Sequence, residues 1–252
     1  MRLVKQKIKL DDGVKSAGIM AMSDVHYGNR YHDSEVFNIY LQWLRDNPDY
    51  YLLLIGDLIE GKTKKSVGFF DQTVEIDDQI EYIVDTYSEF KDRIIAMTGG
   101  NHEKSTWKET GHDIAKSIAK QLSVPYLHNG GWVYITVDGE NGKQIYRSYM
   151  THGSSSATTA GGRINAVMRL KNITRVDLYL HAHMHALLHE KESVYVIENA
   201  SLKLKEVHYV VTGSYLEYLG SYGQEKSYAP SGVSGSPKIK LHADLNRISV
   251  SL

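Results

Sequence analysis

The stretch YYLLLIGD, residues 50–57, decides the fold of this protein. It is an almost unbroken apolar run, which is expected of a strand buried on both faces of a sheet. The run ends in Gly56-Asp57, so the buried strand leads directly into a polar pair. The segments before and after it show which kind of sheet this strand belongs to.

Strand patterns and helix patterns alternate around this run. The other predicted strands of the first part of the chain are GIMAMS (residues 18–23), RIIAMT (93–98) and VDLYL (176–180). Apolar residues at steps of three and four predict amphipathic helices over residues 34–45, from Ile76 to Phe90, from about Gly111 to Leu122, and after Arg163. GGNHE, which follows RIIAMT, is expected to be a loop. This alternation predicts an α/β fold with a mostly central sheet.

The two ends of the chain add further strands. Residues 4–10 alternate in polarity, and WVYITV and QIYRSYM flank the turn DGENG as a strand pair. VYVIENA, VHYVVTG and KIKLHA read as strands without a clear helix, so the chain is β-rich from about residue 190. We therefore expect a second sheet, formed by this C-terminal part and packed on the first, within a single domain spanning residues 1–252.

The composition limits which kinds of metal site and binding surface the protein can have. The chain has 252 residues, no cysteine and a formal charge of −1, so thiolate sites are excluded and any metal must be held by His, Asp, Glu or Asn. The overall charge does not suggest a generic polyanion-binding surface, although it allows a local basic patch. The N-terminus lacks the apolar core of a signal peptide, and no apolar run is long enough to span a bilayer. These features predict a cytoplasmic protein.

Polar clusters follow five of the predicted strands directly. They are Asp24-Val25-His26, Gly56-Asp57, Gly100-Asn101-His102-Glu103, Thr151-His152-Gly153 and Ala182-His183-Met184-His185. In open α/β sheets, ligands bind outside the carboxyl ends of the strands. His183 and His185 are the strongest pair, because alternate residues of an extended segment point to one side.

Each cluster also has a structural explanation when it is taken alone. Asp-x-His pairs are common, Gly-Asp after a strand is usually a turn, and Asn-His-Glu fits a helix cap. A lone His152 is more often a satisfied polar residue than a metal ligand. Five such clusters in this order, each following a strand, are not explained by independent accidents, so they favour a metal site.

The order D-x-H, G-D, G-N-H-E, H-G and A-H-x-H, from Asp24 to His185, resembles the motifs of the calcineurin-like metallophosphoesterase superfamily. Ala182 stands where that family usually has Gly, and it contributes no ligand. The resemblance implies a four-layer α/β/β/α fold, a two-sheet β-sandwich flanked by helices. It also implies a phosphoric ester hydrolase that depends on two divalent metal ions.

The resemblance assigns a role to each motif residue. Asp24, His26 and His185 would hold one ion, and Asn101, His152 and His183 would hold the other. Asp57 would bridge both ions together with a water or hydroxide that attacks phosphorus. His102 would not be a ligand but would stand beside the leaving oxygen as general acid, and Asn101 and His102 would also contact substrate. His181 and His189 have no family role and are expected to be structural or surface residues.

Elementary chemistry supports this ligand set. Two divalent ions carry +4, and two aspartates with a bridging hydroxide subtract three, which leaves a positive charge suited to an anionic phosphate. Such ions activate a water and clamp the phosphoryl oxygens during in-line attack. Mixed N/O ligation suits Mn²⁺, Fe, Zn²⁺, Co²⁺ or Ni²⁺, of which we favour Mn²⁺.

The motif details bear on the substrate. Phosphoprotein phosphatases of this superfamily extend two motifs to GDxxDRG and RGNHE, whereas this chain has GDLIEGK and GGNHE, without either arginine. These forms look more like the bacterial and phage branch of phosphodiesterases and DNA-repair exonucleases. We therefore expect phosphodiester hydrolysis, with DNA or RNA as a candidate substrate. A phosphomonoesterase acting on proteins or metabolites is the alternative, and an inactive metal-binding scaffold is a further one. Related nucleases often pair as dimers, so a homodimer is a candidate assembly, although no segment of this sequence identifies a dimer interface.

Two segments outside the motifs are candidates for substrate contact. SSSATTAGGR, residues 154–163, follows His152, and its Arg163, with Arg169 and Lys171 beyond it, could meet phosphates or form a solvated helix face. The segment SYLEYLGSYGQEKSY contains tyrosines that could stack bases, although packing is the commoner role. They are Tyr215, Tyr218, Tyr222 and Tyr228.

Overall fold

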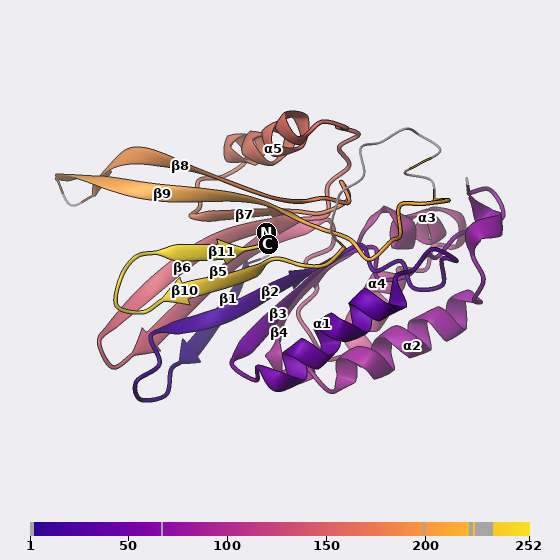
Figure 1. The fold of residues 1–252 in the computed structure, drawn as a ribbon, viewed down its shortest axis with the longest axis horizontal. Helices are drawn as coiled ribbons and strands as arrows, with labels where there is room; N and C mark the ends of the chain where they lie inside the picture. The colour runs from indigo at the N-terminus through magenta and orange to yellow at the C-terminus, as the bar shows by residue number, and fades with distance from the viewer. Residues whose placement is uncertain (1–2, 67, 199, 222–223, 225–233) are drawn as a thin grey trace.

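In the computed structural model, two β-sheets pack face to face and helices cover their outer faces (Figure 1). The structure describes residues 3–66, 68–198, 200–221, 224 and 234–252. The four layers confirm the predicted α/β/β/α sandwich. No helix in these described ranges is long and apolar enough to cross a membrane.

The first sheet contains the strand that YYLLLIGD predicts. Its strands are, in spatial order, β11 (Ile248–Ser251), β10 (Lys238–His242), β2 (Ser16–Met22), β3 (Tyr50–Ile55) and β4 (Ile94–Thr98). β2, β3 and β4 run parallel, and β10 pairs antiparallel with β2. Every residue of β4 is buried, as expected for a strand covered on both faces. The carboxyl ends of the three parallel strands therefore meet at one edge.

The second sheet is larger and mixed. Its strands are, in spatial order, β1 (Leu3–Lys9), β5 (Gly130–Gly139), β6 (Gly142–Thr151), β7 (Leu178–His181), β9 (Ser201–Thr212) and β8 (Leu187–Glu198). β6, β7 and β9 are parallel neighbours, so β6 and β7 also end at a common edge. β8 and β9 form a long antiparallel hairpin that extends to the left in Figure 1.

Helices cover both outer faces. The α-helices are α1 (Ser34–Asp46), α2 (Ile76–Ser88), α3 (Asn101–Thr110), α4 (Ile114–Gln121) and α5 (Ala160–Met168). Short 3₁₀ helices span Phe69–Asp71, Lys91–Arg93 and Arg169–Asn172. α1 begins where Asp33 accepts a hydrogen bond from the Val36 N–H at 3.0 Å, and it buries Phe37, Leu41 and Leu44. An aspartate cap and an apolar stripe of this spacing are sufficient local reasons for this helix.

Three apolar layers hold the sandwich together. One lies between the first sheet and α1, α2 and α4, and includes Leu54 and Ile83. The second lies between the two sheets, where Ile55 and Val210 are buried. The third packs Val167 of α5 against the outer face of the second sheet. The continuous middle layer fixes the two sheet edges relative to each other, and the candidate site lies where these edges meet.

Two expectations about the elements were wrong. The C-terminal strands do not form the second sheet alone: β8 and β9 join it beside β7, whereas β10 and β11 extend the first sheet. Pairing partners are set by tertiary contacts that a local strand pattern does not encode. GGNHE is not entirely a loop, since α3 begins at Asn101, where the Glu103 carboxylate accepts the Gly100 N–H and closes the first turn.

Candidate metal centre

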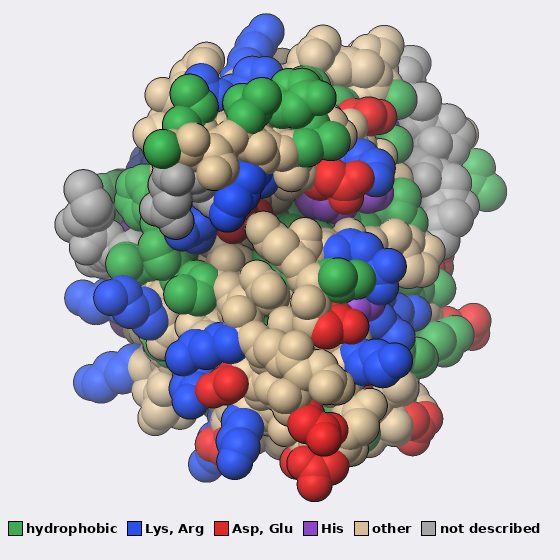
Figure 2. Space-filling view, turned by 90° about the vertical axis from the view of Figure 1, so that its left-hand side faces the viewer, with side chains coloured by type: hydrophobic (Ala, Val, Ile, Leu, Met, Phe, Trp, Pro, Cys, Tyr) green, Lys and Arg blue, Asp and Glu red, His purple; other side chains and the backbone are tan. Residues whose placement is uncertain are grey.

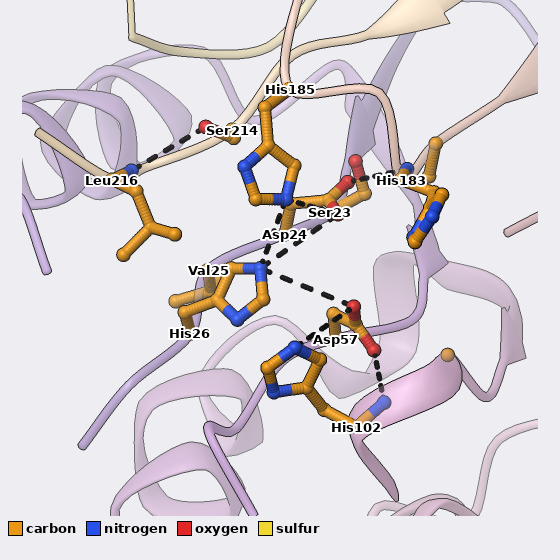
Figure 3. Close-up of polar contacts among 12 residues, drawn as sticks. Ser23, Asp24, Val25, His26, Asp57, His102, His183, His185, Ser214 and Leu216 are labelled. Carbon is orange, nitrogen blue, oxygen red and sulfur yellow. Dashed lines mark hydrogen bonds and ion pairs between the residues drawn. The ribbon is translucent and has the colours of Figure 1, made fainter. Parts of the chain in front are cut away.

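The predicted ligand residues converge at the carboxyl ends of strands from both sheets (Figure 3). Asp24 and His26 follow β2, Asp57 follows β3, and His152 follows β6. Asn101 lies in the first turn of α3 after β4. His183 and His185 lie in the short segment between β7 and β8. The site is thus assembled from the edge that the buried parallel strands define.

The backbone at this edge is unusual. Eight described non-glycine residues have a positive φ, and five of them are predicted ligands: Asp24, His26, Asp57, His183 and His185. This left-handed conformation is uncommon outside glycine, and sparsely populated backbone conformations cluster at functional sites. The extended segment expected for His183 and His185 is therefore wrong, because the chain turns sharply there and sends the two rings to different clusters.

The first cluster contains Asp24, His26 and His185. The His185 Nε2 atom lies 3.2 Å from both Asp24 Oδ1 and His26 Nε2, and His26 Nε2 lies 3.9 Å from the same Asp24 oxygen. Ligand atoms about 2.1 Å from one ion in tetrahedral or octahedral geometry are roughly 3.0–3.4 Å apart. The three atoms therefore have nearly the spacing of one coordination sphere.

The second cluster contains Asn101, Asp57, His152 and His183. The His152 Nε2 atom lies 2.9 Å from Asn101 Oδ1 and 3.0 Å from Asp57 Oδ2. One ligand atom of His183 lies within 4.8 Å of those of Asp57 and His152. The Nδ1–H of His152 is directed to the Ile55 carbonyl at 2.8 Å, which leaves Nε2 to face the cluster.

The two aspartates share one arrangement. One oxygen of each accepts a backbone N–H: Asp57 Oδ1 from His102 at 2.8 Å, and Asp24 Oδ2 from His183 at 3.1 Å. The other oxygens, Asp57 Oδ2 and Asp24 Oδ1, are buried and have no hydrogen bond from the described chain, and neither has His183 Nδ1. Buried polar atoms are rarely left unpaired. Three such atoms among the residues of the two clusters fit bound cations.

Glu60 is a site residue that the sequence motifs did not reveal. Its Oε2 atom lies 3.1 Å from His26 Nδ1 and 3.5 Å from His102 Nδ1, and the residue is 1% exposed. Carboxylates in this position orient a ligand histidine and increase its basicity. In the sequence, only the position of Glu60, three residues after Asp57 within GDLIEGK, could have pointed to this role. An acidic residue at such a position is also common for other reasons.

His102 stands beside the two clusters. Its Nδ1 atom is directed to the Glu60 carbonyl at 2.7 Å, and its Nε2 atom lies 3.9 Å from Asp57 Oδ2. The ring packs edge to face on His26, with centroids 4.5 Å apart. Because the carbonyl is an acceptor, Nδ1 carries the proton of the neutral ring, and a second proton on Nε2 would face the site.

Glu103 fixes the loop that carries Asp57. Its buried carboxylate accepts backbone N–H groups from Gly100 at 2.8 Å, Leu58 at 2.8 Å and Asp57 at 3.1 Å. Gly100 is required here, because a Cβ atom on it would lie 2.1 Å from Asp57 Oδ1. The GNHE motif thus supplies a structural glycine and a structural glutamate besides the two residues that face the site.

The buried charges act strongly on one another. Burial raises the pKa of Asp24, but the charges of His152 and His185 outweigh it and lower the pKa to about 2. Burial likewise lowers the pKa of His152, yet Asp57 and Asp24 raise it to about 10. Opposite charges at short range favour the charged forms. These carboxylates therefore attract cations, whether the cation is a proton on His152 or a metal.

A cavity of about 430 Å³ opens over the clusters. It is lined by His26, Asp57, Asn101, His102 and His185, and also by Arg163, Lys62, Ser155 and Tyr218. Arg163 is buried in the first turn of α5, where its Nε donates to the Ala157 carbonyl at 3.3 Å. The segment that follows His152 therefore does reach the cavity.

Other candidates lie elsewhere. Arg169 and Lys171 do not line this cavity, and Lys171 pairs with Glu192 at 3.6 Å. Tyr215 is fully buried against Phe37 rather than available for stacking. Tyr222 and Tyr228 lie outside the described residues. His181 is buried with Nδ1 on the Ala182 carbonyl, and His189 stacks on His208.

A family model described as calcineurin-like phosphoesterase matches residues 18–232. No curated protein matches the sequence. Among solved structures, the calcineurin-like phosphoesterase YfkN from Bacillus subtilis is 13% identical, with 78% of this chain and 91% of that chain covered at a TM-score of 0.39. A metallophosphoesterase from Sphaerobacter thermophilus is also 13% identical, with 92% and 87% covered at a TM-score of 0.43.

Proposed function

This chain belongs to the calcineurin-like phosphoesterase family, and we propose that it hydrolyses phosphodiester bonds at a centre that holds two divalent metal ions. Asp24, His26 and His185 would hold one ion, and Asn101, His152 and His183 the other, with Asp57 shared. Mn²⁺ is the ion we favour. When bound, the ions would supply positive charge for the phosphoryl oxygens and the acidity that turns water into a nucleophile.

The observation that carries this proposal is the position of Asp57 Oδ2. This buried oxygen lies 3.0 Å from His152 Nε2 and 4.0 Å from His26 Nε2, and these two histidines belong to different clusters. It has no hydrogen bond from the described residues, and its partner oxygen is already occupied by the His102 N–H. A single free carboxylate oxygen between two ligand sets suits a bridge between two ions.

His102 is the proposed general acid. The Glu60 carbonyl oxygen holds the ring at Nδ1, and the Glu60 carboxylate lies 3.5 Å from the same nitrogen, so Nε2 is left to face the site. The proton on Nε2 would then pass to the leaving oxygen. Positioned general acids typically contribute ~10²–10⁴-fold. Asn101 and Arg163 would contact the phosphate, since both line the cavity.

The absence of arginine from two motifs favours a phosphodiester over a phosphomonoester as the substrate. GDLIEGK and GGNHE contain no arginine that could neutralise the second charge of a phosphomonoester dianion. The cavity keeps two cationic side chains, Lys62 and Arg163, and Lys62 lies 3.6 Å from Glu60 Oε1. A diester monoanion, including one in DNA or RNA, needs less positive charge. The phosphomonoesterase is the alternative that the experiment must separate.

The first experiment compares hydrolysis of bis-p-nitrophenyl phosphate and p-nitrophenyl phosphate, with Mn²⁺ added and with chelator. We expect a higher kcat/KM for the diester, and loss of activity with chelator. A preference for the monoester would replace the phosphodiesterase proposal with a phosphatase. Equal rates with and without chelator would contradict the metal-dependent mechanism itself.

A further inference from the structure

A second, separate groove lies on the far side of α3 from the metal centre. It has a volume of about 640 Å³, and residues of α3, α4 and the loops beside them line it. The two helices, labelled in Figure 1, pack against each other. Gly100, Glu103, Lys104 and Trp107 line it from α3 and the loop before it. These residues share one face of the helix because they are three or four positions apart. None of the side chains in this groove is a proposed metal ligand or general acid, and only Glu103 also supports the Asp57 loop.

Three lysines border the groove: Lys104, Lys116 and Lys120. All three are exposed, and within the described ranges none of their side chains forms an ion pair, a hydrogen bond or a ring contact. By contrast, basic and acidic side chains lie interspersed over the end of the molecule shown in Figure 2. In a chain with a formal charge of −1, three exposed lysines therefore border one groove.

The carboxylates of the groove are already engaged. Glu103 is 2% exposed and accepts the backbone N–H groups of the Asp57 loop. Asp113 caps α4 by accepting the Lys116 N–H at 2.9 Å, and it also accepts the Tyr126 hydroxyl at 3.0 Å. Neither acid forms an ion pair with the three lysines, and the lysines outnumber the two carboxylates, so the groove keeps a small excess of positive charge.

Planar rings complete the lining. Trp107 is 48% exposed, and Tyr126 and His128 lie with ring centroids 4.6 Å apart on the groove wall. An exposed tryptophan beside lysines matches single-stranded nucleic-acid sites, where bases stack on aromatic rings and phosphates meet basic side chains. An acidic peptide would use the lysines but would leave the indole face unused.

We propose that the α3–α4 groove binds the phosphate and base of a nucleotide unit, with Trp107 stacking the base and Lys104, Lys116 and Lys120 contacting phosphate. A single strand of nucleic acid and a free nucleotide both offer this chemistry. Binding here is independent of the metal ions, because the groove contains no proposed ligand side chain. The proposal therefore holds whichever phosphoester the metal centre hydrolyses.

The test measures binding of fluorescein-labelled dT12 to the full chain by anisotropy, with chelator present so that the metal centre is inactive. We expect binding that weakens as salt increases. The triple variant Lys104→Gln/Lys116→Gln/Lys120→Gln should weaken binding and reduce the log–log salt slope by about 2, since each single-strand phosphate contact contributes roughly 0.7. Its hydrolysis of bis-p-nitrophenyl phosphate should be unchanged.

A matched control removes the same charge elsewhere. The variant Lys5→Gln/Lys9→Gln/Lys240→Gln loses three exposed lysines from β1 and β10, outside the groove. It should bind dT12 like the unaltered protein. Equal weakening by both triple variants would overturn the proposal, because it would show that overall charge alone attracts the strand. Absence of dT12 and ATP binding to the unaltered protein would overturn it as well.

Trp107 gives a second, independent readout. Stacking on the indole should quench its fluorescence, and Trp107→Ala should weaken binding about 5- to 150-fold. Trp107→Phe should retain most of the affinity but lose the quenching signal. Unchanged affinity in Trp107→Ala would contradict base stacking. Competition by ATP at equal nucleotide concentration would identify a free-nucleotide site, whereas binding of dT12 without competition would identify a strand site.

Discussion

In two regions of this molecule, histidine nitrogens lie at nearly the same distance from each other, but the surrounding charges differ. In the metal centre, His26 Nε2 and His185 Nε2 are 3.2 Å apart. In the β8–β9 hairpin, His189 Nε2 and His208 Nδ1 are 3.0 Å apart, and the rings stack in parallel. His185 and His189 even come from the same short stretch of sequence. A cluster of histidines is therefore not by itself a metal site.

The difference between the two regions lies in their carboxylates. At the centre, Asp57 and Asp24 outweigh the effect of burial on His152 and raise its pKa to about 10. In the hairpin, burial and then the charge of His189 lower the pKa of His208 to about 4. The nearest acid there, Glu206, is 3.9 Å from His208 and pairs with Lys191. We therefore propose that free carboxylate oxygens distinguish the candidate metal centre from the histidine pair of the hairpin.

Substitution of the shared carboxylate should have the largest effect. Asp57→Asn keeps the shape but removes the charge that both clusters share, so we expect kcat/KM to fall about a thousandfold or more. Metal content, measured by mass spectrometry after dialysis, should fall below two equivalents. Asp177→Asn, at the opposite end of β7, serves as the matched control. Two full equivalents of metal in the Asp57 variant would contradict the bridging role.

His102 should separate catalysis from metal binding. Because His102 Nδ1 contacts the Glu60 carbonyl and His102 is not a proposed ligand, His102→Ala should leave metal content nearly unchanged. Turnover should fall about 10²–10⁴-fold for substrates with poor leaving groups. The loss should be smaller for p-nitrophenyl esters, whose leaving oxygen needs little protonation. Equal turnover with every substrate would remove His102 from the mechanism.

Substitution of Glu60 tests whether a carboxylate next to a histidine contributes to metal affinity at the candidate centre but not in the hairpin. Glu60→Gln should weaken metal affinity about 10–100-fold, because His26 loses its charged partner. Glu206→Gln makes the same change beside His208 and should leave metal affinity and kcat/KM unaltered. Isothermal titration with Mn²⁺ compares the two variants. Similar affinities for both would mean that Glu60 only fills space.

Much of this architecture could be predicted from local sequence. The apolar run before Asp57 predicted a strand buried on both faces, and β3 occupies that position. Five polar clusters after strands predicted one edge, since parallel strands end together, and the structure brings those residues within a few ångströms of one another. Helical periodicity and strand polarity are properties of neighbouring residues, so they can be read from the sequence without knowledge of tertiary contacts.

The features that could not be predicted from the sequence depend on contacts between residues far apart in the chain. β10 pairs with β2 across more than two hundred residues, which no local pattern specifies. Glu60 and Glu103 gain their roles only when β3 and α3 are adjacent. His183 and His185 have left-handed backbone conformations, and their rings join clusters that contain different carboxylates. Sequence reasoning identified which residues meet, but not which groups hold them in place.

The smallest expected effect concerns the hairpin, where activity should not change and only stability should. Because His208 has a pKa of about 4 in the folded state against about 6.5 unfolded, the unfolded chain binds more protons between these values. The free energy of unfolding should therefore fall, by about 2 kcal/mol, as the pH drops from 6.5 to 4. His208→Phe removes this titration and should show a shallower decline. Urea unfolding with chelator at several pH values compares the unaltered protein with His208→Phe. Identical slopes of the unfolding free energy against pH would show that His208 is not held neutral.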